Sequence, residues 1–463
     1  VATTLRSQPV APTPSRGAAR PASSHRHGAA ERPARPPPLP PARPEFDILD
    51  FGARSGAPDC TKALRAAIGE VKAAGGGTVH VPPGLFRSAP LDLVSNLTLF
   101  VHRGAVLRAI DDPRLWRVVE PLESYGRGRE GSRAGRRIAF LSGEHLHNVV
   151  ITGDWGTIDG SGARWWAAKA GPRFDGVTQP HLVELRHTRG LEISRLRLIN
   201  SPLWTVHPFA CIGVTVRDVD IRNPVSAPNT DGINPDSSQD VLIENVAYEG
   251  GDDAIAIKSG WDCFGDERGF NRPTRNVTIR NVTVRATRAA ALAIGSEMSG
   301  GVADVLVEGL RVERAGAGGA ICIKTTAARG GFVRNVTVRG VEIGSVTGNW
   351  QQVAGLMIAG RVGGWVPEKN PACSSPPKAL PEISQISFQN VRQLRGTRIE
   401  GPAVRFHGLE EGQVIRGLSL ENVQLEAQEP AAFCSNAEVS VEAVSFSRRP
   451  LVWKSDGRGK PCR

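Results

Sequence analysis

Apolar and polar residues alternate along most of the chain in a short phrase that recurs many times, often with an asparagine at its centre. Clear copies are GLEISRLRLIN at Gly190, GVTVRDVDIRN at Gly213, DVLIENVAYEG at Asp240, NVTIRNVTVRA at Asn276, DVLVEGLRVER at Asp304, NVTVRGVEIGS at Asn335, QISFQNVRQLR at Gln385 and GLSLENVQLEA at Gly417. β-branched residues in period-two alternation are typical of strands, whose successive side chains point to opposite faces. The phrase therefore predicts strands and not a helical repeat.

The copies from Gly190 onward start 23, 27, 36, 28, 31, 50 and 32 residues apart. Such an elastic period is expected when loops of different length interrupt a fixed strand frame. Each unit can bury its apolar side only against itself and its neighbours, so many units must stack into a solenoid. The sequence thus predicts an all-β fold, a parallel β-helix that forms a single domain over residues 45–463.

Residues 61–74 follow a different pattern. Leu64, Ala67, Ile68 and Val71 stand at helical spacing, and a run of three glycines follows. Glycines after the last periodic residue are a helix stop signal. A short helix is expected here, where it would cap the N-terminal end of the solenoid and cover its open strand edge.

The composition changes sharply at the front of the chain. Residues 1–44 hold 11 of the 34 prolines and few large apolar side chains. Such a segment cannot bury enough surface to order itself, so a disordered tail rich in Pro, Arg and Ala is expected. Its Arg, Ala and Ser content is also typical of an organelle targeting segment, which leaves the address of the chain open.

The net charge is +11, and the seven Arg and one Glu of residues 1–44 account for +6, which leaves +5 for the rest of the chain. A mildly positive field suits an acidic polymer or a nucleic acid. Because the sequence has no zinc-finger or recognition-helix pattern, nucleic acid is not an expected partner. No run of about 18 apolar residues is present, so no membrane span is expected.

Three aspartates stand out at turn-like positions of neighbouring units. Asp231 lies in Asn-Thr-Asp-Gly, and Asp252 and Asp253 follow two glycines, 21 or 22 residues later. That interval is close to one short coil, and equivalent positions on adjacent coils lie about 4.8 Å apart. Taken singly, each sequence is explained by turn hydrogen bonds. Together they predict carboxyl groups close enough for one to stay protonated, which supplies both the acid and the base that glycosidic cleavage needs.

The chain from about Glu45 to Val423 resembles the polygalacturonase family, glycoside hydrolase family 28, in the branch typical of plants and some bacteria. The motifs that carry the resemblance are EFDILDFGA at Glu45, SYGRGRE at Ser124, NSPLWTVHP at Asn200, NTDGINPDSS at Asn229, GDDAIAIKSG at Gly251 and GSEMSGGV at Gly295. The resemblance implies a right-handed parallel β-helix that hydrolyses α-linked galacturonate chains with inversion, without metal or organic cofactor. We expect a monomer, secreted to the extracellular space or the cell wall, that acts on the acidic polysaccharide pectin.

Carried over residue by residue, the resemblance assigns roles within the motifs. Asp231, Asp252 and Asp253 match the three catalytic aspartates of the family, one of them the general acid and the others activating water. The expected substrate-binding residues are Asn229, Lys258 and Lys324. An ordinary lysine at a strand exit is an equally good explanation of Lys258.

Two positions depart from the family pattern. A Gly-His-Gly is replaced by three alanines around Ala290, and an Arg-Ile-Lys is replaced by Cys322-Ile323-Lys324. The second change leaves a point charge where the family has a bidentate clamp for a uronate carboxylate, and Cys322→Arg is expected to restore that clamp. Three alternatives therefore remain: a hydrolase of another pectic linkage such as rhamnogalacturonan, a non-catalytic or weakly active wall-binding relative, and a calcium-dependent lyase on the same architecture.

Other residues have structural explanations beside functional ones. We expect Glu297, His181 and His207 to be scaffold residues. Five tryptophans either stack on sugar rings or fill space: Trp165, Trp166, Trp204, Trp261 and Trp350. The seven cysteines lack the paired spacing of a zinc site, and the sequence leaves open whether Cys434 and Cys462 form a disulfide.

Overall fold

The computed structural model describes residues 43–126, 135–170, 176–261, 263–267, 269–348, 353–360, 379–409, 414–446, 449–450, 453–454 and 462. Within it, Arg43–Arg463 forms one compact unit. The tail expected at residues 1–44 lies outside the described residues, apart from its last two positions. The prediction of a single domain over residues 45–463 stays a prediction, and its bounds lie within this unit.

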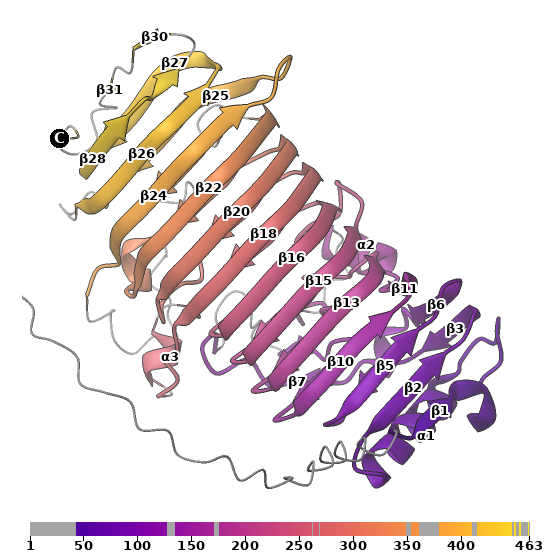
Figure 1. Cartoon of the computed structure of the whole chain (residues 1–463). Coiled ribbons are helices and arrows are strands. Elements are labelled where there is room, and N and C mark those ends of the chain that lie inside the picture. The colour runs from indigo at the N-terminus through magenta and orange to yellow at the C-terminus, as the bar shows by residue number, and fades with distance from the viewer. Residues whose placement is uncertain are drawn as a thin grey trace, which may run out of the picture. The chain divides into compact units, whose positions relative to one another are not determined.

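The unit is a right-handed parallel β-helix in which each central coil contributes one long and one short strand, and strands of one kind pair in parallel from coil to coil (Figure 1). The long strands are β13 (Arg189–Ile199), β15 (Ile212–Arg222), β16 (Gln239–Gly250), β18 (Thr274–Thr287), β20 (Val302–Ala315), β22 (Phe332–Val346), β24 (Glu382–Gln393) and β26 (Ile415–Leu425). The short ones are β12 (Val183–Arg186), β14 (Val206–Phe209), β17 (Ile255–Ile257), β19 (Leu292–Ile294), β21 (Ile321–Lys324) and β23 (Leu356–Ala359), continued by β25 (Ile399–His407) and β27 (Ala427–Ser435).

The remaining elements complete both ends of the stack. The first coils hold β1 (Glu45–Asp47), β2 (Gly77–Val81), β3 (Gly84–Ser88), β4 (Leu91–Asp92), β5 (Leu97–Val101), β6 (Ala105–Ala109), β9 (Leu141–Glu144), β10 (His147–Gly153) and β11 (Gly156–Asp159). Smaller elements are β7 (Val118–Val119), β8 (Arg136–Arg137), α2 (Ala163–Ala170), α3 (Phe264–Glu267), β28 (Ala437–Glu442), β29 (Ser445–Phe446), β30 (Arg449–Pro450) and β31 (Trp453–Lys454).

The central asparagine of the repeated phrase is a corner residue. In β18, Asn276 and Asn281 have positive φ angles of 55° and 52°, a left-handed conformation that Asn tolerates better than most residues. The side-chain amide of Asn281 donates to Oδ1 of Asn245 on the preceding coil over 2.6 Å. The long strands therefore bend at this central position, which is Asn in β16, β18, β24 and β26 and Gly in β20 and β22. Where asparagines are neighbours, their amides pair from coil to coil.

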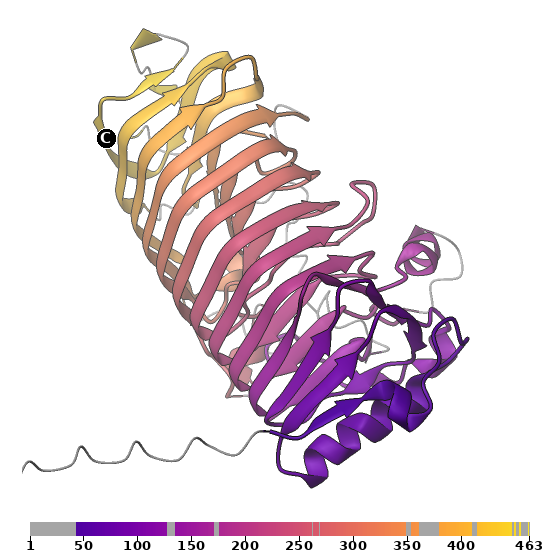
Figure 2. The same ribbon diagram turned by 45° about the vertical axis from the view of Figure 1, so that its right-hand side comes forward.

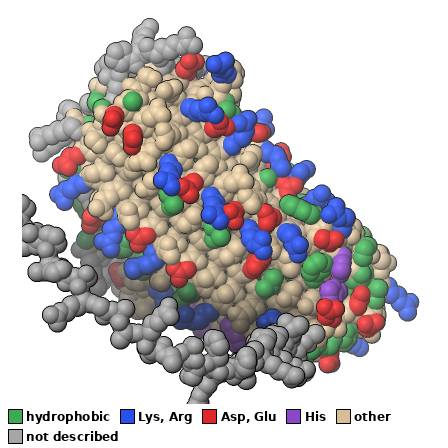
Figure 3. Space-filling model, in the orientation of Figure 1, with side chains coloured by type: hydrophobic (Ala, Val, Ile, Leu, Met, Phe, Trp, Pro, Cys, Tyr) green, Lys and Arg blue, Asp and Glu red, His purple; other side chains and the backbone are tan. Residues whose placement is uncertain are grey.

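Alternation within each phrase separates the core from the surface. Ile243, Ile279 and Val307 are paired along successive long strands and are at most 1 % exposed. Oppositely charged side chains alternate over the outer face of the same strands (Figure 3), as in the 2.6 Å pair of Arg311 with Glu342. Exposed pairs of this kind contribute only about 0–1 kcal/mol each, so the buried apolar ladders carry most of the stability.

The helix expected near the N-terminus is present as α1 (Thr61–Ala73). It lies across the N-terminal end of the stack (Figure 2), with Leu64 and Val71 completely buried. Oδ1 of Asp59 accepts a hydrogen bond from the Thr61 amide over 2.7 Å at the start of the helix. The prediction of a capping helix is confirmed. In the part of the chain that the structure describes, no helix is long and apolar enough to cross a bilayer.

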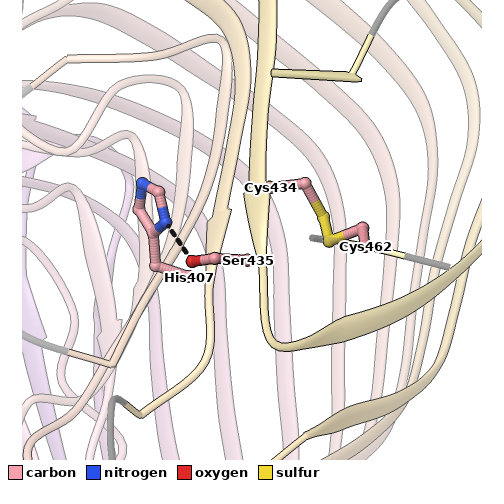
Figure 4. Close-up of a disulfide and its surroundings, with 4 residues drawn as sticks. All are labelled: His407, Cys434, Ser435 and Cys462. Carbon is pink, nitrogen blue, oxygen red and sulfur yellow. Dashed lines mark hydrogen bonds between the residues drawn. A yellow bond between two sulfur atoms is a disulfide. The ribbon is translucent and has the colours of Figure 1, made fainter. Parts of the chain in front are cut away.

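A disulfide links Cys434 in β27 to Cys462, 28 residues later in the sequence, with 5.6 Å between the Cα atoms. Figure 4 shows the bond next to Ser435, whose hydroxyl lies 2.8 Å from Nδ1 of His407. The staple that the sequence left open is therefore formed. It joins Cys462 covalently to β27, in one of the last coils of the helix.

Candidate active site

The register of the short strands brings the aspartates together. Ile233 forms an isolated bridge with Ile255 of β17. Asp231 stands two residues before Ile233, and Asp253 stands two residues before Ile255. The amide of Gly232 donates to the carbonyl oxygen of Asp253 over 3.0 Å. Asp231 and Asp253 therefore occupy equivalent positions on adjacent coils, as their sequence interval predicts.

One carboxyl oxygen from each of Asp231, Asp252 and Asp253 lies within 4.8 Å of the other two. Asp231 and Asp253 are 3 % and 2 % exposed, whereas Asp252 is half-buried. Asn229 donates from Nδ2 to Oδ2 of Asp252 over 3.3 Å, and Asn234 donates to Oδ2 of Asp231 over 3.2 Å. The predicted convergence is present, and Asp252 is the member most accessible to a ligand.

Lys324, at the end of β21, is the cation closest to Asp253. Its Nζ lies 2.7 Å from Oδ2 of Asp253, and 23 % of its side chain is exposed. The other oxygen of Asp253 accepts a hydrogen bond from the Ala290 amide over 2.9 Å. Burial alone lowers the pKa of Lys324, but the charge and hydrogen bond of Asp253, together with the charges of Cys322 and Asp252, outweigh burial and raise it. Asp253 thus accepts at both oxygens, as a carboxylate does.

Lys258 follows β17 and lies between two buried carboxyl groups. Its Nζ is 3.1 Å from Oε2 of Glu297 and 3.7 Å from Oδ2 of Asp231, and it sits 4.2 Å from the ring centroid of Trp204. Only 4 % of Lys258 is exposed. The positive charge of Lys258 therefore acts on the carboxyl cluster from the buried interior of the protein.

Two members of the cluster are poised to hold a proton. Burial and the nearby charge of Asp252 raise the pKa of Asp231 well above its usual value. Burial and the charge of Asp253 likewise raise the pKa of Asp252. Oδ1 of Asp231 is buried and has no hydrogen-bond partner among the described residues, which is unfavourable for an ionised oxygen. Asp231 and Asp252 therefore keep a proton to higher pH than an exposed aspartate does, beside Asp253, which accepts hydrogen bonds at both oxygens.

Tyr248 is a functional candidate that the sequence analysis missed. Its hydroxyl donates to the carbonyl oxygens of Thr230 and Asp252, over 2.9 and 2.8 Å, and its side chain is 1 % exposed. It thereby ties together the two turns that carry the aspartates. The sequence could have pointed to Tyr248, because the chain contains only two tyrosines. Tyr248 lies in the strand between the Asp231 motif and the Asp252-Asp253 motif.

The two departures from the family pattern meet in one small apolar cluster. Ala290 and Cys322 are 1 % and 0 % exposed and pack with further small or flexible residues: Ala256, Ala293, Ala354, Met357 and Ala359. An arginine at position 322 would place a buried charge among these side chains, which is costly. The structure therefore does not support the expectation that Cys322→Arg restores a working clamp, because position 322 faces this cluster.

His181 and His207 belong to a buried polar network beside Trp204. Each has its Nδ1 about 3 Å from Oε2 of Glu184, at 2.9 and 3.0 Å, and Oε1 of Glu184 lies 2.6 Å from Nη1 of Arg136. Burial lowers the pKa of His181 to about 4. Burial acts the same way on His207, but Asp236 and Glu184 outweigh it and raise the pKa of His207. The arrangement fits the scaffold role expected for both histidines.

The tryptophans serve mainly as packing residues. Trp165, Trp204 and Trp261 are 3 %, 3 % and 7 % exposed, which leaves little ring surface for a sugar. Trp166 is partly exposed, and its indole nitrogen donates to the carbonyl oxygen of Ser201 over 3.1 Å. Trp350 lies outside the described residues. The space-filling explanation therefore holds for three of the five tryptophans.

Three groups of described residues bring metal-ligating atoms within 4.8 Å of one another. They are Asp231 with Asp252 and Asp253, His181 with Glu184 and His207, and Glu123 with Glu144 and His187. In the first group the ammonium groups of Lys258 and Lys324 already balance carboxyl charge and repel a cation. In the second, the guanidinium of Arg136 does so. In the third, Arg186 pairs with Glu144 over 2.7 Å. The donor sets thus fit a polar network with protein cations better than a metal centre.

Comparison with known proteins gives a consistent result. Residues 127–444 match the model of the family described as "Glycosyl hydrolases family 28". A probable polygalacturonase of Vitis vinifera is 38 % identical over 370 residues, which cover 78 % of this chain and 72 % of the relative.

Solved structures share the same fold. An exopolygalacturonase from Thermotoga maritima is 26 % identical, with a TM-score of 0.72 over 90 % of this chain and 94 % of that one. A polygalacturonase from Erwinia carotovora ssp. carotovora is 22 % identical, with a TM-score of 0.63 over 93 % and 99 % of the two chains. The family match spans more than half of the sequence, including every residue of the carboxyl cluster. This chain is a member of glycosyl hydrolase family 28.

Proposed function

We propose that the protein hydrolyses α-linked galacturonate chains of pectin, using Asp231, Asp252 and Asp253 as its catalytic carboxyl groups. The observation that carries the proposal is the convergence of the three carboxyl groups within 4.8 Å, on the coils where the family motifs lie. A group that donates a proton and a group that accepts one are both needed to cleave a glycosidic bond. The mixed protonation of this cluster supplies both.

Asp252 is the best candidate for the general acid. It is the least buried of the three, so it can approach the oxygen of the departing sugar. Its pKa is raised by burial and by the charge of Asp253, so it retains a proton at a pH where an exposed aspartate is ionised. A raised pKa is the usual way in which a glycosidase keeps its acid protonated.

Asp253 and Asp231 are then the groups that activate water. Asp253 is held at both oxygens by Lys324 and the amide of Ala290. Oδ1 of Asp231 has no partner among the described residues, so it can hydrogen-bond to the attacking water and orient it while Asp253 takes up the proton. Attack by water gives inversion, whereas attack by a carboxylate gives retention. We favour inversion, which the family resemblance implies. The spacing is shorter than the about 6.5–9.5 Å usual for inverting pairs, so the product anomer must be measured.

A second candidate function is the hydrolysis of another pectic linkage. The observation that favours it is the apolar cluster around Ala290 and Cys322, which stands where the family pattern has a histidine and an arginine. Without that arginine, Lys324 is the cation beside the carboxyl cluster that could bind a uronate carboxylate, because 23 % of its side chain is exposed. A substrate with alternating acidic and neutral sugars would need fewer cations.

Incubation with oligogalacturonates of defined length tests the proposal. We expect shorter products whose summed mass exceeds that of the substrate by one water per cleavage, and NMR of fresh product should show the inverted anomer. Rhamnogalacturonan oligosaccharides serve as the parallel substrate. Cleavage of these alone would support the second candidate, and cleavage of neither would leave a wall-binding relative.

Chelation distinguishes a hydrolase from a calcium-dependent lyase. We expect activity to survive an excess of EDTA, because lysine ammonium groups, and not a metal ion, neutralise the carboxyl cluster. The products should lack the ultraviolet absorbance of an unsaturated sugar, since hydrolysis forms no double bond. A loss of activity that calcium restores, together with that absorbance, would overturn the hydrolytic assignment.

We further propose that the protein is secreted and works as a monomer on extracellular or wall pectin. The disulfide between Cys434 and Cys462 supports an oxidising compartment. Few large apolar side chains are exposed among the described residues, whereas a subunit interface usually needs a contiguous apolar patch; they are Leu49, Leu115, Val118, Leu380 and Val441.

A further inference from the structure

Lys258 has an unequal relation to its two carboxyl neighbours. Its Nζ is 3.1 Å from Oε2 of Glu297, within hydrogen-bond range, and 3.7 Å from Oδ2 of Asp231, beyond the usual range of about 2.7–3.2 Å. The side chains of Lys258, Asp231 and Glu297 are at most 9 % exposed, so solvent screens these interactions weakly. Glu297 therefore holds the ammonium group more tightly than Asp231 does.

The charges of the site explain why this matters. Four carboxyl groups face one another there, those of Asp231, Asp252, Asp253 and Glu297, together with two ammonium groups. Lys324 pairs with Asp253 at 2.7 Å, and Lys258 pairs with Glu297. Among the described residues, Asp252 has no cation within ion-pair distance, and Asp231 has only the more distant ammonium of Lys258, at 3.7 Å.

We propose that Glu297 is a positioning residue that draws the Lys258 ammonium away from a full ion pair with Asp231 and thereby preserves the proton of the catalytic carboxyl cluster. This inference rests on the proposed hydrolytic function. Glu297 does not contact the reacting atoms in this scheme. It acts through Lys258, which also lies over the face of Trp204 and is thus fixed on a second side.

The electrostatics of the neighbouring groups agree with the geometry. Burial alone would raise the pKa of Glu297, but the charges of Lys258, Lys324 and Arg329, that of Lys258 the largest, together outweigh it and lower the pKa to about 2. The charged and titratable groups that face Lys258, Glu297 and Asp231 from all sides are Asp252, Asp253, Lys324, Arg329 and Tyr248. Among the described residues, the ammonium group of Lys258 is the only cation within ion-pair distance of Asp231.

The direction of the effect follows from the charges. Removing the negative charge of Glu297 removes a competitor for Lys258, so the ammonium can approach Asp231 and stabilise its ionised form. Asp231 and Asp252 titrate as a coupled pair, so the pair as a whole binds its last proton less tightly, and the pKa for losing that proton falls. The proton that Asp252 transfers is this last proton of the pair. A general acid must be protonated to act, so activity is lost as pH rises through that pKa. The alkaline limb of the pH–rate profile should therefore move to lower pH.

The test is Glu297→Gln, which keeps the shape of the side chain. We expect the alkaline limb of kcat to shift down by about one pH unit or more, with activity at the acidic end largely kept. Glu297→Asp, which keeps the charge, should restore most of the wild-type profile. Lys258→Met should shift the limb in the opposite direction, because it removes a cation from the cluster. A loss of packing alone predicts no such opposed pair of shifts.

Glu308→Gln is the matched control, because Glu308 is an exposed carboxylate that pairs with Arg339 on the outer face of β20. Its profile should equal the wild type. Carboxyl titration of 13C-labelled aspartate by NMR, with thermal melting for each variant, gives a readout without turnover. Unchanged aspartate titration in folded Glu297→Gln would overturn the inference. A wild type that titrates as expected but cleaves no pectic substrate would instead overturn the proposed function.

Discussion

Asp252→Asn is expected to lower kcat about 10²–10⁴-fold, the usual contribution of a general acid. The amide has the same shape as the acid but cannot transfer a proton to the departing oxygen. Asp252 is half-buried, and its carboxyl group accepts one hydrogen bond from the side-chain amide of Asn229 over 3.3 Å. The substitution should therefore leave folding intact. KM should change little. Initial rates on oligogalacturonate, with a thermal melt of the same preparation, measure both effects.

Asp50→Asn is the control for this change. Asp50 is exposed in the short helix between β1 and α1, far in sequence from the carboxyl cluster, so its activity should match the wild type. A substrate with a better leaving group provides a second check, since it needs less help from an acid and should be cleaved by Asp252→Asn at a larger fraction of the wild-type rate. Wild-type kcat in Asp252→Asn would mean that the acid is another residue.

The fold could be predicted from the sequence because the residue pattern of the repeated phrase specifies both the strands and their corners. Period-two alternation gives the strands, and the asparagine gives the corner, as the positive φ of Asn281 shows. The aspartates could be predicted because a single coil of ordinary length separates Asp231 from Asp253. Only one register relation was needed to bring them together.

The rest of the site depends on register relations across longer and less regular loops. Lys258 meets Glu297, 39 positions away, and Lys324 meets Asp253, 71 positions away. The elastic period of the repeat does not reveal these pairs, because each loop length changes which residues face each other. The sequence leaves open whether Lys258 contacts substrate or is an ordinary lysine at a strand exit, and in the structure it is only 4 % exposed, with its Nζ 3.7 Å from Oδ2 of Asp231.

The two departures from the family pattern show the same limit. In the sequence, Ala290 and Cys322 are separate substitutions, and the missing arginine looks like a defect that Cys322→Arg would repair. In the structure both side chains belong to one buried apolar cluster. A large polar residue at either position would need the other neighbours to change as well. The pair is therefore better understood as a single coordinated change in packing.

Lys324→Ala is expected to have two effects, since the ammonium both pairs with Asp253 and remains 23 % exposed. Removing one partner of a buried ion pair costs about 3–5 kcal/mol, and the partial exposure of Lys324 places the expected loss of folding stability at the lower end of that range. Asp253 also loses the cation that balances its charge, so kcat should fall. A uronate carboxylate of the substrate loses the ammonium group of Lys324, so KM for acidic oligosaccharides should rise.

Lys62→Ala is the matched control, because Lys62 is exposed on α1 and alanine preserves the helix. It should leave the melting temperature, kcat and KM unchanged. The effects of Lys324→Ala can be separated by comparing acidic with methyl-esterified oligosaccharides: a lost uronate contact raises KM only for the acidic series, whereas a perturbed Asp253 lowers kcat for both. If folded Lys324→Ala keeps its affinity for every acidic substrate, Lys324 acts only through Asp253, and the uronate must be recognised elsewhere in the site.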